Sequence, residues 1–161
     1  MYPSGFYRDK NNELNVQGIK LDSLTKKYGS PLFIYDTGLM KDRYEVFQNT
    51  VKNVKGNIHY AVKANDSLNI IKFFGKLGAG ADIVSIGEFH KCIAAGITPD
   101  KIIFSGVGKD KNEIEIAIKN NILQFNIESE EELYDIYEVA YKLKITANIC
   151  LRINPDIAPN T

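Results

Sequence analysis

The 161-residue chain has no excess of charge of either sign, because 20 lysines and arginines balance 20 aspartates and glutamates. Proteins that attract nucleic acids or anionic membranes by general electrostatics carry a basic surplus. We therefore expect neither a nucleic-acid nor a membrane partner. Long apolar runs are absent too, since no stretch approaches a membrane span and residues 1–10 hold no apolar core of signal-peptide length. The expected location is cytoplasmic.

Cysteine and histidine are scarce. The only two cysteines, Cys92 and Cys150, lie far apart in a helical and a strand pattern, so we expect both to be small buried apolar residues. This spacing fits neither a disulfide framework nor a zinc site. His59 and His90 have no partner at ligand spacing, so no metal site is expected.

Alternating strand and helix patterns dominate the chain from Leu21 onward. Strands are expected at 31–35, 58–63, 81–84, 102–105, 123–127 and 146–153, and helices near 21–28, 67–77, 87–95, 111–121 and 130–143. A further helix is expected after a cap at Asp36 or Thr37, with apolar positions at helical period from Leu39 to Val51. Successive strands end at positions 21 residues apart, namely Lys63, Val84, Ser105 and Asn126. One strand plus one crossover helix has about this length, so the pattern predicts an α/β fold with a parallel sheet.

The first residues differ from the rest, since residues 5–16 are typical of two short strands around an Asn-rich turn. We expect a leading β segment at residues 1–20 and an incomplete β/α barrel at residues 21–161. Five or six strand–helix units are visible, whereas a closed barrel has eight. An open parallel sheet leaves strand edges unpaired. We therefore expect the amino-terminal part of a larger protein.

Lys63 ends an apolar strand and precedes the turn-prone run Asn65-Asp66-Ser67. The carboxyl ends of parallel strands are where barrels build their chemistry. A lysine that is partly buried there has a lowered pKa, and its neutral amine can form a Schiff base with a carbonyl compound. The alternative is an ordinary strand-end lysine whose ammonium reaches solvent.

The run Tyr60-Ala61-Val62-Lys63-Ala64-Asn65 resembles the pyridoxal-phosphate lysine motif of the alanine-racemase-like decarboxylases for ornithine, arginine and diaminopimelate. Four further segments resemble the diaminopimelate decarboxylases in order and spacing: Gly80–Glu88, Ile103–Lys109, Phe125–Glu130 and Leu151–Asp156. The resemblance implies a partial (β/α)8 TIM-like barrel of the alanine-racemase type, whose leading β segment packs with a carboxyl-terminal β domain. It further implies pyridoxal 5'-phosphate on Lys63, decarboxylation of meso-2,6-diaminopimelate to L-lysine, and a homodimer.

Three further residues are implied to bind the cofactor. Asp82 follows Lys63 on the next strand, where its carboxylate favours a protonated nitrogen on the lysine, although it could equally cap the following loop. Glu88 stands at capping-box spacing from Ser85, so it could instead tie down a helix start. Arg152 ends the last strand and either lines the cofactor cavity or pairs with Asp82 or Glu128.

Other parts of the resembled site lie outside this chain: the histidine that stacks on the cofactor ring, the glycine-rich phosphate-binding turn and the acidic partner of the pyridine nitrogen. We therefore expect the isolated chain to have no useful decarboxylase activity. Alternatives are a decarboxylase for arginine, ornithine or carboxynorspermidine, and a non-catalytic remnant of the fold. A small single-barrel pyridoxal-phosphate carrier is a third, and the run Ser105–Lys109 and the leading β segment disfavour it.

Overall fold

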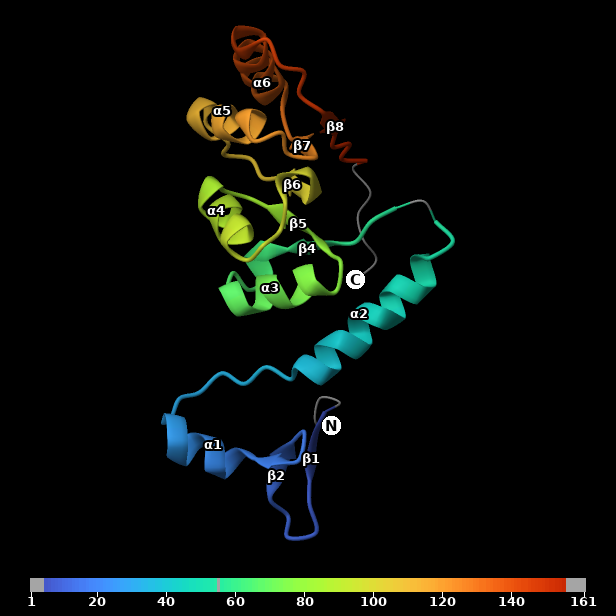
Figure 1. Cartoon of the computed structure of the whole chain (residues 1–161), viewed down its shortest axis with the longest axis vertical. Helices are drawn as coiled ribbons and strands as arrows, with labels where there is room; N and C mark the ends of the chain where they lie inside the picture. Colours follow the sequence, from blue (N-terminus) through green and yellow to red (C-terminus); the bar gives the residue numbers. More distant parts are fainter. Residues whose placement is uncertain (1–4, 55, 156–161) are drawn as a thin grey trace. The chain divides into compact units, whose positions relative to one another are not determined.

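The computed structural model describes residues 5–54 and 56–155 (Figure 1). It divides into two compact units, residues 1–56 and residues 57–161, which are described separately below. The expected division into residues 1–20 and 21–161 stays a prediction. In the described part of the chain, no helix has both the length and the apolar character of a membrane span.

The first unit contains a small antiparallel sheet and two helices. The strands β1 (Phe6–Arg8), β2 (Leu14–Val16) and β3 (Ile19–Lys20) pair in the order β1-β2-β3. Helix α1 (Leu21–Tyr28) ends at Gly29, whose φ of 88° is favourable for glycine. Helix α2 (Thr37–Val51) begins after Asp36, whose carboxylate accepts a hydrogen bond from Leu39 N at 3.0 Å. The two expected leading strands are confirmed, and β3 is an addition to them.

The buried strand expected at residues 31–35 is wrong. The segment forms no strand and is largely exposed, with Phe33 86% exposed. A strand needs a neighbour to accept and donate its backbone hydrogen bonds, and the paired strands of the first unit are β1, β2 and β3. The apolar run therefore remains an extended loop.

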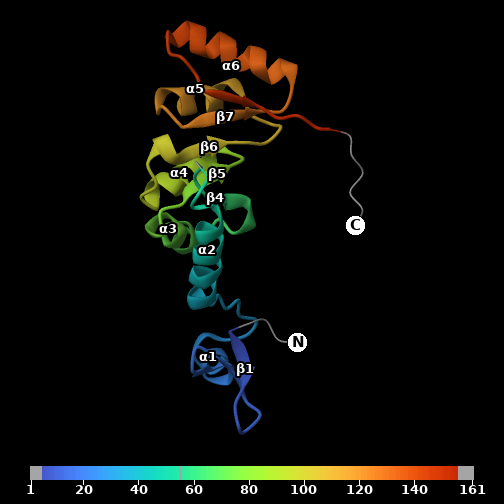
Figure 2. The same cartoon turned by 90° about the vertical axis from the view of Figure 1, so that its right-hand side faces the viewer.

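The second unit is a five-stranded parallel sheet whose strands follow one another in sequence order, β4-β5-β6-β7-β8. Helices α4 to α6 lie on one side of it (Figures 1 and 2). The strands are β4 (His59–Ala61), β5 (Gly80–Ile83), β6 (Ile102–Phe104), β7 (Gln124–Ile127) and β8 (Ile149–Leu151). The helices are α3 (Leu68–Lys76), α4 (Ile86–Ala94), α5 (Lys111–Lys119) and α6 (Glu130–Leu143), with short 3-10 turns at Val62–Ala64 and Pro99–Lys101. Every strand and helix expected after residue 57 is confirmed. Strand β5 has the expected length and begins one residue earlier, and the other four strands are shorter than expected.

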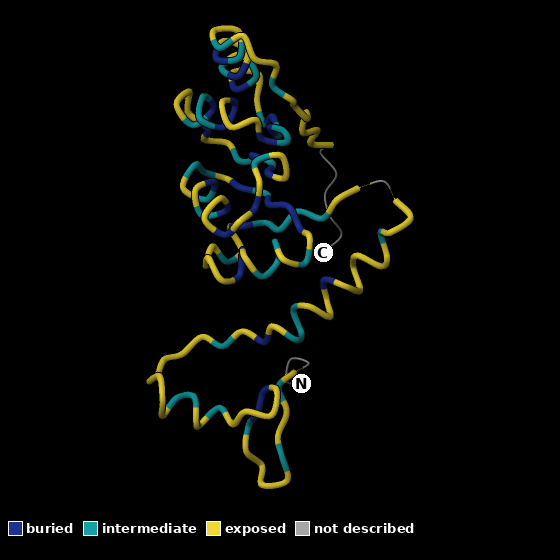
Figure 3. Tube along the Cα trace, in the orientation of Figure 1, coloured by how far each residue is buried: buried dark blue, intermediate teal, exposed yellow. Residues whose placement is uncertain are grey.

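The core of the second unit lies between the sheet and these helices (Figure 3). Phe104 on β6 and Phe125 on β7 are buried and stack with ring centroids 6.0 Å apart. Ile71, Ile83 and Ile114 belong to the same core cluster and are completely buried. Burying such side chains contributes about 1.5–3 kcal/mol each. This packing fixes the strands and therefore the positions of the residues at their carboxyl ends.

Candidate functional site

A cavity of about 440 Å³ lies at the carboxyl ends of the five parallel strands. Its lining includes the four residues that the sequence spaces 21 residues apart: Lys63, Val84, Ser105 and Asn126. Each of them lies within two residues of the carboxyl end of one strand of the sheet, so the constant interval brings them to the same edge. The volume is in the range of pockets that hold small organic ligands.

Lys63 lines this cavity from the 3-10 turn Val62–Ala64, directly after β4. The turn is closed by a hydrogen bond from Asn65 N to Val62 O at 3.0 Å. Lys63 is exposed, which is the alternative of a strand-end lysine that reaches solvent. Strand β4 ends two residues before it, at Ala61, so Lys63 stands on the turn and not in the sheet.

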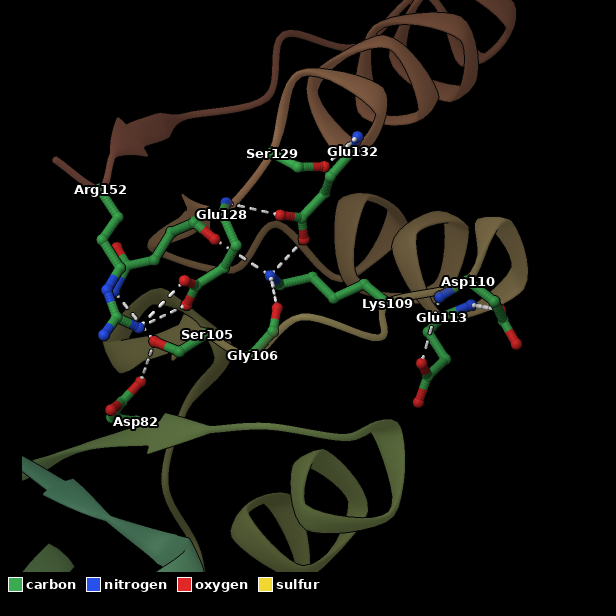
Figure 4. A network of polar contacts seen from close by, with 11 residues as sticks. Asp82, Ser105, Gly106, Lys109, Asp110, Glu113, Glu128, Ser129, Glu132 and Arg152 are labelled. Atoms are coloured by element: carbon green, nitrogen blue, oxygen red, sulfur yellow. Dashed lines mark hydrogen bonds and ion pairs between the residues drawn. The ribbon is translucent and has the colours of Figure 1, made fainter. Parts of the chain in front are cut away.

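Asp82 lines the cavity from β5 and receives a chain of hydrogen bonds that crosses the sheet (Figure 4). Ser105 Oγ donates to Asp82 Oδ1 at 2.5 Å, and Asn126 Nδ2 donates to Ser105 Oγ at 2.9 Å. Gln124 Nε2 in turn donates to Asn126 Oδ1 at 2.9 Å. All donors point toward the carboxylate, so the chain of hydrogen bonds orients it.

Arg152 lines the same cavity and follows β8. Its Nη1 donates to both carboxylate oxygens of Glu128, each at 3.0 Å (Figure 4). The expected alternative of an ion pair with Glu128 is therefore present. Because Nη1 makes both contacts and a guanidinium has five N–H donors, its other nitrogens can bind a carboxylate or phosphate of a ligand.

Glu88 lies at the start of α4, and the lining of the cavity does not include it. Its Oε2 accepts a hydrogen bond from Val84 N at 2.8 Å, and Ser85 Oγ accepts one from Glu88 N at 3.2 Å. The side chain therefore ties down the helix start, which is the alternative that the spacing suggested. The structure brings Lys63, Asp82 and Arg152 to one cavity, and a cofactor contact of Glu88 stays a prediction.

Cys150 corrects a second expectation. It is exposed and lines the cavity, whereas Cys92 is buried as expected. All three residues of β8 are exposed, so a strand pattern alone did not imply burial there. Cys150 stands two residues before Arg152, and alternate residues of a strand share a face, which is the signal that could have placed it. Burial, with the Glu88 carboxylate nearby, raises the pKa of the Cys92 thiol to about 12.

The lining side chains fit a small anionic carbonyl compound. The Lys63 amine can bind a carbonyl carbon covalently, and the Arg152 guanidinium can pair with an anionic group. Asp82 adds a carboxyl group from β5, the strand next to β4. Within residues 5–54 and 56–155, no cluster of three His, Cys, Asp or Glu side chains could hold a metal ion.

Comparison with known proteins finds relatives among pyridoxal-dependent enzymes. The family model described as "Pyridoxal-dependent decarboxylase, pyridoxal binding domain" matches residues 37–161. The diaminopimelate decarboxylase of Aquifex aeolicus is 43% identical over 155 residues, which are 96% of this chain and 36% of that protein.

Two solved structures are also similar. The Helicobacter pylori diaminopimelate decarboxylase complexed with L-lysine is 42% identical with a TM-score of 0.84, covering 88% of this chain and 36% of that one. The M. jannaschii diaminopimelate decarboxylase in co-complex with L-lysine is 35% identical with a TM-score of 0.87, covering 98% and 38%. The chain thus spans little more than a third of the length of these relatives. Its fold is that of the corresponding part of alanine-racemase-like decarboxylases, and the chain belongs to the pyridoxal-dependent decarboxylase family.

Proposed function

We propose that this protein decarboxylates meso-2,6-diaminopimelate to L-lysine, with pyridoxal 5'-phosphate held on Lys63. The observation that carries the proposal is that Lys63, Asp82 and Arg152, which belong to three separate sequence motifs, line one cavity. The identity to diaminopimelate decarboxylases, 43% for the Aquifex aeolicus enzyme, supports the substrate.

Pyridoxal phosphate, when bound, supplies a ring that accepts the electron pair left behind as carbon dioxide departs. In the proposal Lys63 is the point of attachment, and Asp82 supplies a carboxylate from β5, the strand that pairs with β4. Ser105 and Asn126 hold that carboxylate in one orientation through their hydrogen bonds. Arg152 offers its remaining guanidinium donors to an anionic group of cofactor or substrate.

Glu88 belongs to the proposed cofactor site through its position at the start of α4. Its carboxylate fixes the Val84 backbone, and Val84 lines the cavity. A contribution through Val84 requires no contact between Glu88 and the cofactor.

The first experiment tests cofactor attachment. The chain is incubated with pyridoxal phosphate, reduced with borohydride and mapped by mass spectrometry. We expect about one label per chain, at Lys63, and its loss in Lys63→Ala. A matched control is Lys101→Ala, which removes another exposed lysine that does not line the cavity. Labels scattered over many surface lysines would contradict the expectation that this chain alone forms a specific pyridoxal-phosphate pocket at Lys63.

The second experiment tests the substrate. The segment of the Aquifex aeolicus enzyme that this chain matches is replaced by this chain, and release of carbon dioxide is measured. We expect activity on diaminopimelate and its loss in the Lys63→Ala chimera. Preference for arginine, ornithine or carboxynorspermidine would favour a related decarboxylase. A chimera that melts cooperatively but is inactive would favour a non-catalytic remnant.

The wider expectations belong to the same proposal. A leading β segment at residues 1–20 would pack with a carboxyl-terminal β domain, and the barrel would begin at residue 21. A homodimer in the cytoplasm is the proposed assembly and location. Sedimentation of the active protein tests the assembly, since a monomeric active species would contradict it.

A further inference from the structure

Lys109 carries a buried charge that the proposed function does not use. It lies between β6 and α5, and its side chain has no solvent exposure. Its Nζ donates to Gly106 O at 2.6 Å, to Asn126 O at 3.0 Å and to the carboxylate of Glu132 (Figure 4). The same nitrogen lies 5.5 Å from the ring centroid of Phe104. All three N–H donors of the ammonium therefore have acceptors.

One set of contacts leads from Lys109 to Asp82. The ammonium holds the backbone carbonyls of Asn126 and Gly106, and Gly106 directly follows Ser105. The side chains of Asn126 and Ser105 form the hydrogen-bond chain that ends on Asp82 Oδ1. The ammonium thus fixes the backbone next to both members of that chain.

A second set leads from Lys109 to Arg152. Glu132 binds the ammonium with Oε1 and accepts a hydrogen bond from Glu128 N with Oε2, at 2.7 Å. Glu128 in turn presents its carboxylate to Arg152 Nη1. Ser129 caps helix α6 and accepts from Glu132 N at 3.3 Å, which places the glutamate at the helix start.

Stability is a weak explanation for this pair. Replacing a buried ion pair by apolar residues of similar volume is often neutral or stabilising, because the desolvation of two charges offsets their attraction. What an apolar pair lacks is directed hydrogen bonds, here to two carbonyls and one amide N–H at the ends of β6 and β7. The pair is better explained by the geometry that it imposes.

We propose that Lys109 is a positioning residue, whose buried contacts with Glu132, Gly106 and Asn126 hold both Asp82 and Arg152 in place at the candidate site. The inference rests on the proposed function only for the identity of the ligand, pyridoxal phosphate, that binds at that site. Lys109 contacts neither cofactor nor substrate in this proposal. It acts through the strand ends that it connects.

The test compares two double variants of the chain. Lys109→Met with Glu132→Leu removes the buried pair and leaves no unpaired buried charge, whereas Glu115→Leu with Lys119→Met removes an exposed ion pair on α5. We expect both to unfold cooperatively in urea. In the first variant alone, the NMR resonances of the Glu128 amide and the Arg152 guanidinium should shift. Borohydride-trapped pyridoxal phosphate at Lys63 should fall about tenfold or more, because small misplacements of such groups have large effects.

Unchanged resonances and labelling in a folded first variant would overturn the proposal. If that variant does not fold, the single variant Glu132→Gln tests the positioning role of Lys109 instead. It keeps one side-chain oxygen as an acceptor for Lys109, but it loses the second carboxylate oxygen, which accepts the hydrogen bond from Glu128 N–H. Shifted Glu128 and Arg152 resonances would then support positioning, and unchanged ones would overturn it. Failure of the unsubstituted chain to label at Lys63 would count against the proposed function, while the resonances still decide the role of Lys109.

Discussion

Gly80→Ala should destabilise the second unit strongly, although it adds one methyl group. Gly80 is buried at the start of β5, and a Cβ there would lie 2.4 Å from the backbone oxygen of Lys101 and 2.4 Å from His59 Nδ1. A backbone carbonyl cannot move away without disturbing the sheet, where Gly80 N also donates to Ile58 O at 2.9 Å. Overpacking of this kind costs about 1–3 kcal/mol, and a contact with backbone favours the upper part of that range.

Urea unfolding followed by far-ultraviolet circular dichroism measures the effect, since the chain has no tryptophan. With a slope of about 1–3 kcal/mol per molar urea, a loss of about 2 kcal/mol lowers the midpoint by roughly 1 M. Gly108→Ala is the matched control, because a Cβ there meets nothing within 4 Å. We expect the control to be neutral or up to about 1 kcal/mol more stable. A Gly80→Ala protein within about 0.5 kcal/mol of the unsubstituted chain would refute the reasoning.

Three further predictions concern the core, a helix cap and the thiols. Phe125→Ala removes a buried ring that stacks on Phe104 and should lower the free energy of unfolding by about 3–5 kcal/mol in the same titration. Asp110→Ala removes the capping box of α5 and should cost about 0.5–2 kcal/mol, and an unchanged midpoint would contradict a role for the cap. Iodoacetamide near pH ~8 should alkylate the exposed Cys150 and spare Cys92, whose pKa of about 12 keeps its thiol protonated, whereas peptide mapping that finds both modified would contradict the burial of Cys92.

The strand–helix order of the second unit could be predicted because each element has a clear hydrophobic period and clear ends. Asp110 and Glu113, three residues apart, form the capping box that begins α5, a local motif with a known sequence spacing. The regular interval from Lys63 to Asn126 predicted a parallel sheet, and the cavity lies at the edge where the strands of that sheet end. Local sequence patterns were sufficient to predict the strands wherever neighbouring strands pair through backbone hydrogen bonds.

Other features depend on contacts that a sequence pattern does not encode. The apolar run at residues 31–35 has strand composition, but among residues 5–54 no strand pairs with it. Lys109 follows a glycine-rich turn and looks like a surface lysine, yet it is buried against Glu132. Glu132 itself stands at capping-box spacing from Ser129, which gave no sign that its carboxylate would bind an ammonium and the Glu128 amide instead.

The strand ends that line the cavity differ in how their side chains are connected, and this governs how the site can change by mutation. Val84 directly follows β5, the strand that carries Asp82, and substitutions of its side chain can alter the shape of the cavity without removing a side-chain hydrogen bond of Asp82. Ser105 and Asn126 are coupled by a direct hydrogen bond, so their substitutions should be non-additive. Ligand preference can therefore evolve in single steps at Val84, whereas the hydrogen-bonded residues must change together.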